Sequence, residues 1–233
     1  MLKWILPKKQ RKAYKAWRRL AFAPVPESLE HLRNARGIVH IGAHKGQERY
    51  IYRKLGLDVL WIEGNPEIFP TLQQNLRRFP RQRPIQALLS ETEGDEVVFH
   101  VSSNDGLSSS ILDFSGHSTF YPDVSMAGQM RLRTKTFDSV ISENGIDLTR
   151  YDAMTLDVQG AELIVLRGVG EHLRNFRWLT METSDQETYA GGQTWGQLKA
   201  FLTPFGFREV SRNIFEEDKR MGTYFDVVLE RQA

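Results

Sequence analysis

Residues 151–173 read YDAMTLDVQGAELIVLRGVGEHL, and this stretch indicates the fold class more clearly than any other part of the chain. Its first half is an apolar strand that ends at Asp157. Its second half is a helix that places Leu163 and Leu166 on one face, and Gly160 permits the sharp turn between the two. A strand that runs directly into an amphipathic helix is the repeating unit of α/β proteins.

The same unit recurs through most of the chain. Predicted strands cover 37–44, 58–64, 84–90, 96–103, 131–137, 151–158 and 178–184, and predicted helices cover 45–56, 66–79, 137–145, 160–173 and 194–206. The strand at 131–137 is expected at a sheet edge. Two closing strands, 208–216 and 223–232, flank a short polar turn and predict an antiparallel hairpin. Repeated units of this kind predict a parallel sheet with helices on both faces.

Ligands of such sheets bind outside the carboxyl ends of the strands, where the strand order reverses. The strand ends that matter are predicted near residues 42, 63, 88, 157 and 182, and four of them carry small or acidic side chains. The segment 104–128 is rich in serine, glycine and aspartate, and we expect a functional loop there because compact domains keep few long idle loops.

Two strand ends predict a nucleoside-shaped ligand site. The run Gly42–Gly46 (GAHKG) joins a strand to a helix, where glycine permits a tight turn and a helix N-terminus favours an anionic group. Glu63 follows Gly42 by 21 residues, the separation at which an acid accepts hydrogen bonds from ribose hydroxyls. His44 replaces the middle glycine of a dinucleotide fingerprint, which disfavours a nicotinamide oxidoreductase.

Asp157 closes the most apolar strand and is expected to point into the crevice. Partial burial would raise the pKa of its carboxyl and suit it as a base or as an orienting group. Glu162 has two interpretations, a functional acid or a first-turn residue that complements the helix dipole. No spacing in the sequence specifies a metal site, and no metal is predicted.

Five segments, in this order, resemble the FkbM family of methyltransferases: HIGAHKGQE, WIEGNPEIFPTLQQNL, QALLSETEGDEVVFHV, NDGLSSSILDF and LDVQGAELIVLRGVGEHL. The resemblance covers residues 37 to about 185, and DVQGAELIVLRG is its most specific part. It implies an α/β class I methyltransferase Rossmann-like fold, with a seven-stranded, mostly parallel sheet and a C-terminal antiparallel hairpin. It also implies S-adenosylmethionine as the methyl donor and a hydroxyl of a sugar or natural product as the acceptor.

The resemblance also implies a set of cofactor-binding residues. The glycine turn would line the methionine end of the cofactor, the acid after the second strand would take the ribose, and the third strand end would flank the adenine. The matching positions are Gly42, Ala43, His44, Gly46, Glu63, Asn65, Ala87, Leu88, Ser109, Ser110 and Asp157.

A hydroxyl acceptor needs a base, because it is a poor nucleophile until it loses its proton. A positioned base contributes about 10²- to 10⁴-fold in rate. Asp157 is the first candidate and Glu182, on the neighbouring strand, is the second; His44 and His117 follow.

Three positions depart from the family pattern. His40 stands where class I methyltransferases commonly carry an acid before the glycine turn, which puts in doubt a contact from this position to the ammonium group of the cofactor. Gln159 and Thr155 replace a frequent glutamate and a frequent lysine, and both fit as tolerated variants.

The net charge of +2 over 233 residues hides an asymmetry. Residues 1–23 carry eight basic side chains and no acid, so the remaining chain holds 23 basic and 29 acidic residues. We predict a basic, helical segment over 1–26 and the methyltransferase domain over 27–233. The basic segment either makes a peripheral contact with a membrane or an acidic partner, or packs its aromatic side chains on the domain.

Composition also limits the function classes. The chain has no cysteine, hence no disulfide framework and no thiolate metal site. No apolar run reaches membrane length and no signal peptide precedes the domain, so we expect a cytoplasmic protein. The acidic body predicts no nucleic-acid partner, and DVQG stands where base-modifying enzymes typically carry an Asn-Pro-Pro-aromatic motif.

Alternatives to a small-molecule methyltransferase stay open. One is a nucleic-acid methyltransferase, and the other is a cofactor-binding module without catalysis. The acceptor pocket is expected to lie between segments 104–128 and 185–195, whose Tyr121, Tyr189 and Trp195 suit stacking on a ring or plain packing.

Overall fold

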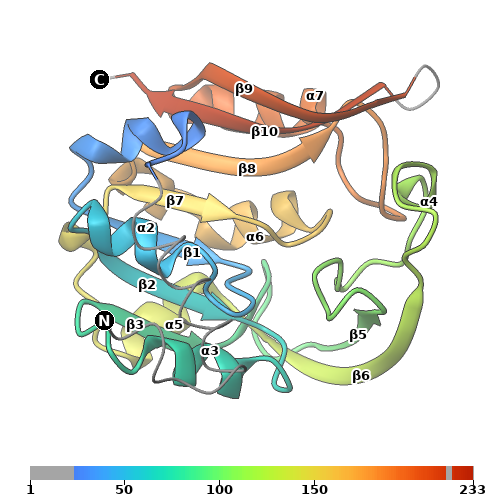
Figure 1. Cartoon of the computed structure of the whole chain (residues 1–233), viewed down its shortest axis with the longest axis horizontal. Helices are drawn as coiled ribbons and strands as arrows, with labels where there is room; N and C mark the ends of the chain where they lie inside the picture. The colour runs from blue at the N-terminus through green and yellow to red at the C-terminus, as the bar shows by residue number, and fades with distance from the viewer. Residues whose placement is uncertain (1–23, 219–221, 233) are drawn as a thin grey trace, which may run out of the picture.

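The computed structural model describes residues 24–218 and 222–232, so the predicted basic helix falls largely outside these ranges. The division of the chain at residue 26 stays a prediction. A seven-stranded sheet with the order β3-β2-β1-β7-β8-β10-β9 forms the centre of the protein (Figure 1). Its parallel strands are β3 (Gln82–Gln86), β2 (Asp58–Glu63), β1 (Gly37–Ile41), β7 (Ala153–Leu156) and β8 (Trp178–Ser184).

The two C-terminal strands close this sheet as the predicted antiparallel hairpin. β10 (Gly222–Arg231) pairs with β8 and with β9 (Phe207–Asp218), and both pairings are antiparallel. The strand order reverses between β1 and β7, which places a ligand crevice at their carboxyl ends. The predicted seven-stranded, mostly parallel sheet with a C-terminal antiparallel hairpin is therefore confirmed.

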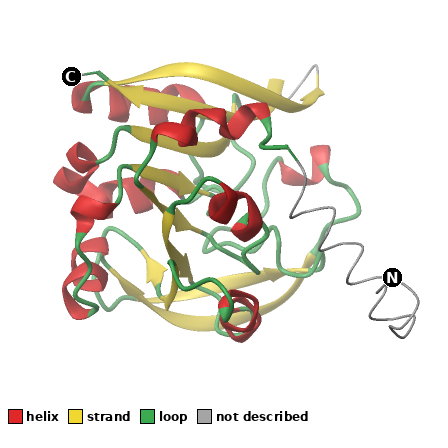
Figure 2. Cartoon of the chain, turned by 60° about the vertical axis from the view of Figure 1, so that its left-hand side comes forward, coloured by secondary structure: helices red, strands yellow, loops and turns green. Residues whose placement is uncertain are grey.

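Helices cover both faces of the sheet (Figure 2). One face carries η2 (Glu27–Asn34), α2 (Arg49–Lys54) and α3 (Phe69–Leu76), and the other carries α5 (Phe137–Glu143), α6 (Glu162–Val169) and α7 (Trp195–Leu202). Short 3₁₀ turns lie at η3 (Leu148–Arg150), η4 (Gly170–Asn175) and η5 (Thr203–Phe205). No helix within the described residues is long and apolar enough to cross a membrane.

The sheet separates two apolar clusters because successive strand residues point to opposite faces. Val39 and Ile41 of β1 pack with α5, α6 and α7, whereas Ile38 packs with η2, α2 and α3. All five residues of β1 are buried. The central strands can therefore hold the side chains at their ends in fixed positions.

A second, three-stranded sheet corrects two strand predictions. It has the order β4-β6-β5, from β4 (Leu88–Leu89), β6 (Met126–Lys135) and β5 (Glu96–Ser102). The strand predicted over 84–90 is split, because the chain leaves the main sheet after Gln86 and Leu88 pairs with Thr134 of β6. The expected edge strand at 131–137 is wrong, since β6 is the middle strand of this sheet.

The second sheet stands beyond the carboxyl ends of the parallel strands, together with the short helix α4 (His117–Phe120) (Figure 1). The loop predicted over 104–128 thus contains one helical turn and ends where β6 begins. The helix predicted over 45–56 is also shorter, because Gly46 has a left-handed φ of 67° and regular helix begins only at Arg49.

Candidate functional site

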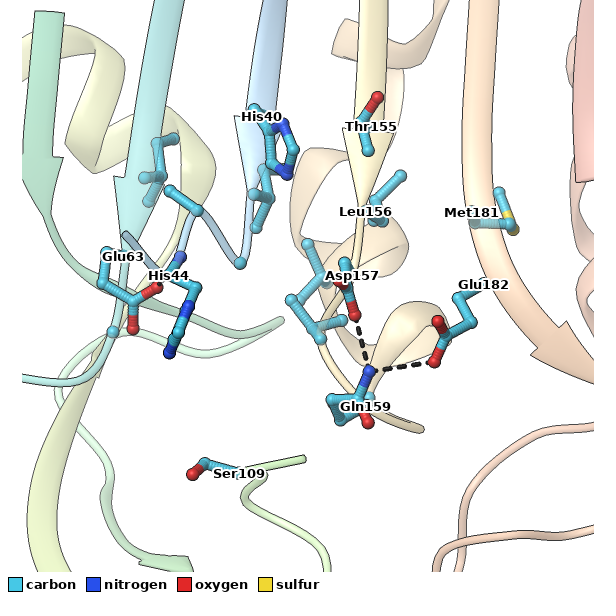
Figure 3. Close-up of a pocket in the computed structure, with 18 of the residues that line it drawn as sticks. His40, His44, Glu63, Ser109, Thr155, Leu156, Asp157, Gln159, Met181 and Glu182 are labelled. Atoms are coloured by element: carbon cyan, nitrogen blue, oxygen red, sulfur yellow. Dashed lines mark hydrogen bonds between the residues drawn. The ribbon is translucent and has the colours of Figure 1, made fainter. Parts of the chain in front are cut away.

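The carboxyl ends of β1, β2, β7 and β8 surround a cavity of about 320 Å³ (Figure 3). A volume of this size is typical of small-molecule sites. The predicted site residues in its wall are Gly42, Ala43, His44, Glu63, Asn65, Ala87, Leu88, Ser109, Ser110, Asp157 and Glu182. Gly46 is not part of the wall; a Cβ there would lie 2.9 Å from Cδ1 of Leu72, so this glycine lets the turn pack on α3.

Gly42 lies where the end of β1 packs closely against the end of β7. Its φ is 81°, and a Cβ at this position would lie 1.8 Å from the carbonyl oxygen of Asp157. The Asp157 backbone N–H donates to the Ile41 carbonyl at 3.0 Å. Glycine is required here because the end of β1 approaches the end of β7 too closely for any side chain.

Glu63 fixes the glycine turn to the end of β2. Its Oε2 accepts from the His44 backbone N–H at 2.6 Å, and its Oε1 accepts from the Asn65 backbone N–H at 2.7 Å. Burial raises the pKa of the Glu63 carboxyl, and the two backbone hydrogen bonds oppose that rise. Each carboxylate oxygen keeps a lone pair that can accept a second hydrogen bond.

The serine-rich segment is attached to the glycine turn. Gln47 Nε2 lies 2.8 Å from His44 Nδ1, and His44 Nε2 lies 2.9 Å from the carbonyl oxygen of Asp105. Since a carbonyl only accepts, Nε2 carries the proton and donates it, while Nδ1 accepts from the Gln47 amide. Lys45 forms an ion pair with the Asp105 side chain. Both nitrogens of His44 are engaged, which argues against His44 as a base.

Asp157 and Glu182 are joined by one side-chain amide (Figure 3). Gln159 Nε2 donates to Asp157 Oδ1 at 2.6 Å and to Glu182 Oε1 at 2.9 Å. The Tyr189 hydroxyl donates to Gln159 Oε1 at 2.5 Å, which fixes the orientation of the amide. The Tyr224 hydroxyl also donates to Glu182. The two predicted acids thus form an ordered pair at one end of the cavity.

Both acids of this pair have raised pKa values. Burial raises the pKa of the Glu182 carboxyl to about 8, and the negative charge of Asp157 adds to the rise. Burial also raises the pKa of Asp157, while the Gln159 hydrogen bond opposes it. A carboxyl with a pKa near neutrality can release and take up a proton under working conditions, as a general base must.

Other predicted candidates belong to the packing. His117 is buried, stacks on Phe114 with 4.1 Å between ring centroids, and places Nε2 3.2 Å from Ser108 Oγ. Tyr189 and Trp195 are buried, and neither forms part of the cavity wall. Tyr121 and His117 are likewise outside that wall.

The sequence patterns did not single out three residues that belong to this site. Glu48 and Asp226 form part of the cavity wall, and Tyr224 holds Glu182. A signal existed for Asp226, because it is the one polar residue in the apolar run YFDVVL of the last strand. Glu162 is not part of the cavity wall; its Oε1 accepts from the Val158 and Gly160 backbone N–H groups and so holds the turn after β7.

Within residues 24–218 and 222–232, no three histidine, aspartate or glutamate side chains are placed to hold a metal ion together. The arrangement is a nucleoside-sized cavity. At one end the Glu63 carboxylate can accept hydrogen bonds from two neighbouring hydroxyls (a diol acceptor), and at the other lie the two titratable acids Asp157 and Glu182.

The methyltransferase FkbM domain matches residues 40–209 of the chain. Among curated proteins, the 2-O-methyltransferase NoeI of Sinorhizobium fredii (strain NBRC 101917 / NGR234) is 30% identical over 162 residues, which are 66% of this chain and 65% of that relative. The match thus spans just under two thirds of the length of the curated relative.

Two solved structures are among those to which the chain is similar. The TehB-like SAM-dependent methyltransferase from Corynebacterium glutamicum is 16% identical with a TM-score of 0.44, over 97% of this chain and 100% of that one. The magnesium protoporphyrin IX methyltransferase from Synechocystis, with bound SAM, is 11% identical with a TM-score of 0.45, over 94% of this chain and 91% of that one.

Proposed function

Because the chain belongs to the methyltransferase FkbM domain family, we propose that it transfers a methyl group from S-adenosylmethionine to a hydroxyl of a small acceptor, a sugar or a natural product. S-adenosylmethionine is the cofactor of this family. The observation that carries the proposal is the ordered pair Asp157 and Glu182, which shares a cavity with the diol acceptor Glu63. An O-methyltransferase needs these two features together, a nucleoside site and a base.

The cavity fits the nucleoside half of the cofactor. Glu63 offers one free lone pair on each oxygen, which suits the two hydroxyls of a ribose. Ala87 and Leu88 supply apolar surface beside it, and Gly64 lies so close to Leu88 that a Cβ would be 2.9 Å from its Cδ1. We assign the ribose to Glu63, the adenine to Ala87 and Leu88, and the methionine end to Gly42, Ala43 and His44.

Glu63→Ala is expected to weaken binding of S-adenosylhomocysteine by about 1–3 kcal/mol, or roughly 5- to 150-fold, because charged hydrogen bonds to the ribose are lost. Titration calorimetry measures the change. Glu67→Ala, which removes an exposed acid outside the cavity wall, is the control and should bind as the wild type does. Equal affinities of Glu63→Ala and Glu67→Ala for S-adenosylhomocysteine would contradict the assignment of the ribose to Glu63.

When bound, the cofactor supplies a methyl group on a positively charged sulfur. The protein must hold the acceptor oxygen in line with that carbon and remove the hydroxyl proton. We assign proton removal to the Asp157 and Glu182 pair. Glu182 takes the proton, because its pKa of about 8 suits a base near neutrality, and Asp157 stays hydrogen-bonded to Gln159 beside the reacting groups.

The pH dependence of kcat/KM follows from Glu182. Only its ionised form accepts a proton, and a pKa of about 8 leaves most of it protonated at lower pH. We expect kcat/KM to rise with pH, by up to about tenfold per unit, and to level off above a pH of about 8. A glutamate with its ordinary pKa would give a flat profile between roughly pH 6 and 9, and such a profile would contradict the assignment.

Transfer of a labelled methyl group to a panel of acceptors tests the proposed function. Incubation with methyl-labelled S-adenosylmethionine and free sugars, glycosides and hydroxylated natural products should label at least one hydroxyl compound. The product should be an ether that survives mild alkali, whereas a methyl ester would lose its label. Tight cofactor binding without transfer to any acceptor would favour a non-catalytic module, and labelled nucleic acid would favour the other alternative.

A further inference from the structure

Glu48 is a half-buried acid in the cavity wall that forms no ion pair within the part of the chain the structure describes. It directly precedes α2 and forms part of the cavity wall together with Gly42 and Ala43. Within residues 24–218 and 222–232, its carboxyl forms no hydrogen bond to another side chain. A carboxylate that is withdrawn from water without a cationic partner is costly, so such a group either stays protonated or meets a positive ligand.

The surroundings of Glu48 increase this cost. Burial raises the pKa of its carboxyl to about 7; its own backbone N–H opposes the rise, and the charge of Asp157 adds to it. Asp226 forms part of the same cavity wall, and burial, followed by the charges of Asp157 and Glu48, raises its pKa to about 7. Three carboxyls therefore share one region of the cavity.

Arg49, the basic residue next to Glu48 in the sequence, is directed elsewhere. Arg49 Nη1 donates to the Gly46 carbonyl at 2.6 Å, and its guanidinium lies 4.6 Å from the centre of the Tyr50 ring. Arg49 lowers the pKa of Glu48 only as the last of its influences. The region thus carries an excess of negative charge.

His40, which stands before the glycine turn where related enzymes commonly carry an acid, cannot supply a negative charge to the cavity. Its ring stacks on Trp61 with 4.8 Å between centroids, and Nδ1 lies 3.0 Å from the Tyr52 hydroxyl. Burial lowers the pKa of His40 to about 3, so the imidazole is neutral. Any carboxylate that meets a cation on this side of the cavity must come from another position.

We propose that Glu48 binds the ammonium group of the methionine part of S-adenosylmethionine. The inference rests on the proposed function, which brings an amino-acid cation into this cavity. The two acids near the glycine turn then bind different parts of the cofactor: Glu63 binds the ribose hydroxyls and Glu48 binds the ammonium group. Asp226 adds to the negative potential of the cavity, but the contact with the ammonium group is assigned to Glu48.

A ligand pair separates this role from a structural one. 5′-Methylthioadenosine keeps the nucleoside and the sulfur of S-adenosylhomocysteine but lacks its amino-acid part. Calorimetry with Glu48→Gln should show about tenfold weaker binding of S-adenosylhomocysteine, with 5′-methylthioadenosine bound within about twofold of wild type. Glu63→Ala should instead weaken both ligands.

Glu162→Gln is the control for loss of an acid with a raised pKa. Burial raises the pKa of Glu162 to about 7 as well, yet Glu162 accepts from two backbone N–H groups and lies outside the cavity wall. It should not change the ratio of the two affinities. An unchanged ratio in Glu48→Gln would overturn the proposal, as would equal weakening of both ligands. A wild-type protein that binds neither ligand would overturn the proposed function as well.

Discussion

Glu182→Gln is expected to lower kcat by about 10²- to 10⁴-fold, because an amide cannot take the acceptor proton. Its affinity for S-adenosylhomocysteine should stay within about twofold of wild type, since glutamine has the same shape and no cofactor contact is assigned to Glu182. Single-turnover transfer of labelled methyl, measured at saturating cofactor, gives the rate of the chemical step.

The pH profile distinguishes loss of a base from a disturbed site. Removing the base should also remove the rise of the rate towards pH 8, whereas Asp157→Asn should lower the rate and retain a rise. Tyr224→Phe removes the hydrogen bond to Glu182 but keeps its carboxyl, so it serves as the milder control. A Glu182→Gln enzyme with wild-type kcat would place the base elsewhere, with Asp157 as the next candidate.

Gly42→Ala is expected to destabilise the fold by about 2–5 kcal/mol, the sum of a left-handed backbone and a steric clash. The clash is severe, because the new Cβ would lie 1.8 Å from the Asp157 carbonyl oxygen and the ends of β1 and β7 would have to separate. Urea unfolding followed by circular dichroism measures the loss. For a chain of this length the melting temperature should fall by roughly 4–20 °C.

Gly94→Ala is a matched control for the backbone cost. Gly94 has nearly the same φ, 80° against 81°, but a Cβ there meets nothing within 4 Å. It should lose only the left-handed contribution, about 1–2 kcal/mol. If the two variants lose the same stability, the contact between β1 and β7 is not what requires glycine at position 42.

The fold could be predicted because its signals are local. The apolar strand before Asp157 and the helix after Gly160 follow the periodicities of their elements, and the two closing strands lie on either side of a short polar turn. The prediction of one continuous strand over 84–90 is wrong. Leu88 continues the apolar pattern, but its backbone pairs with Thr134, far away in the sequence. A pairing between residues so far apart in the sequence cannot be predicted from the local pattern of side chains.

The site divides in the same way. Gly42, Glu63 and Asp157 follow directly from strand ends, where the topology itself brings side chains together. Glu48 looks like an ordinary acid at the start of a helix, and only the folded chain shows that it shares the cavity with Asp157 and Asp226. Gln159 was noted as a tolerated variant, yet its amide joins the two catalytic candidates.

The crystal structure of the protein with bound S-adenosylhomocysteine is the most direct measurement. We predict the ribose hydroxyls within hydrogen-bonding distance of the Glu63 carboxylate, the ammonium at Glu48, and the sulfur turned towards Asp157 and Glu182. A nucleoside bound outside this cavity, with Glu63 not contacting the ribose, would contradict the convergence of the glycine turn, the diol acceptor and the acid pair on one cofactor.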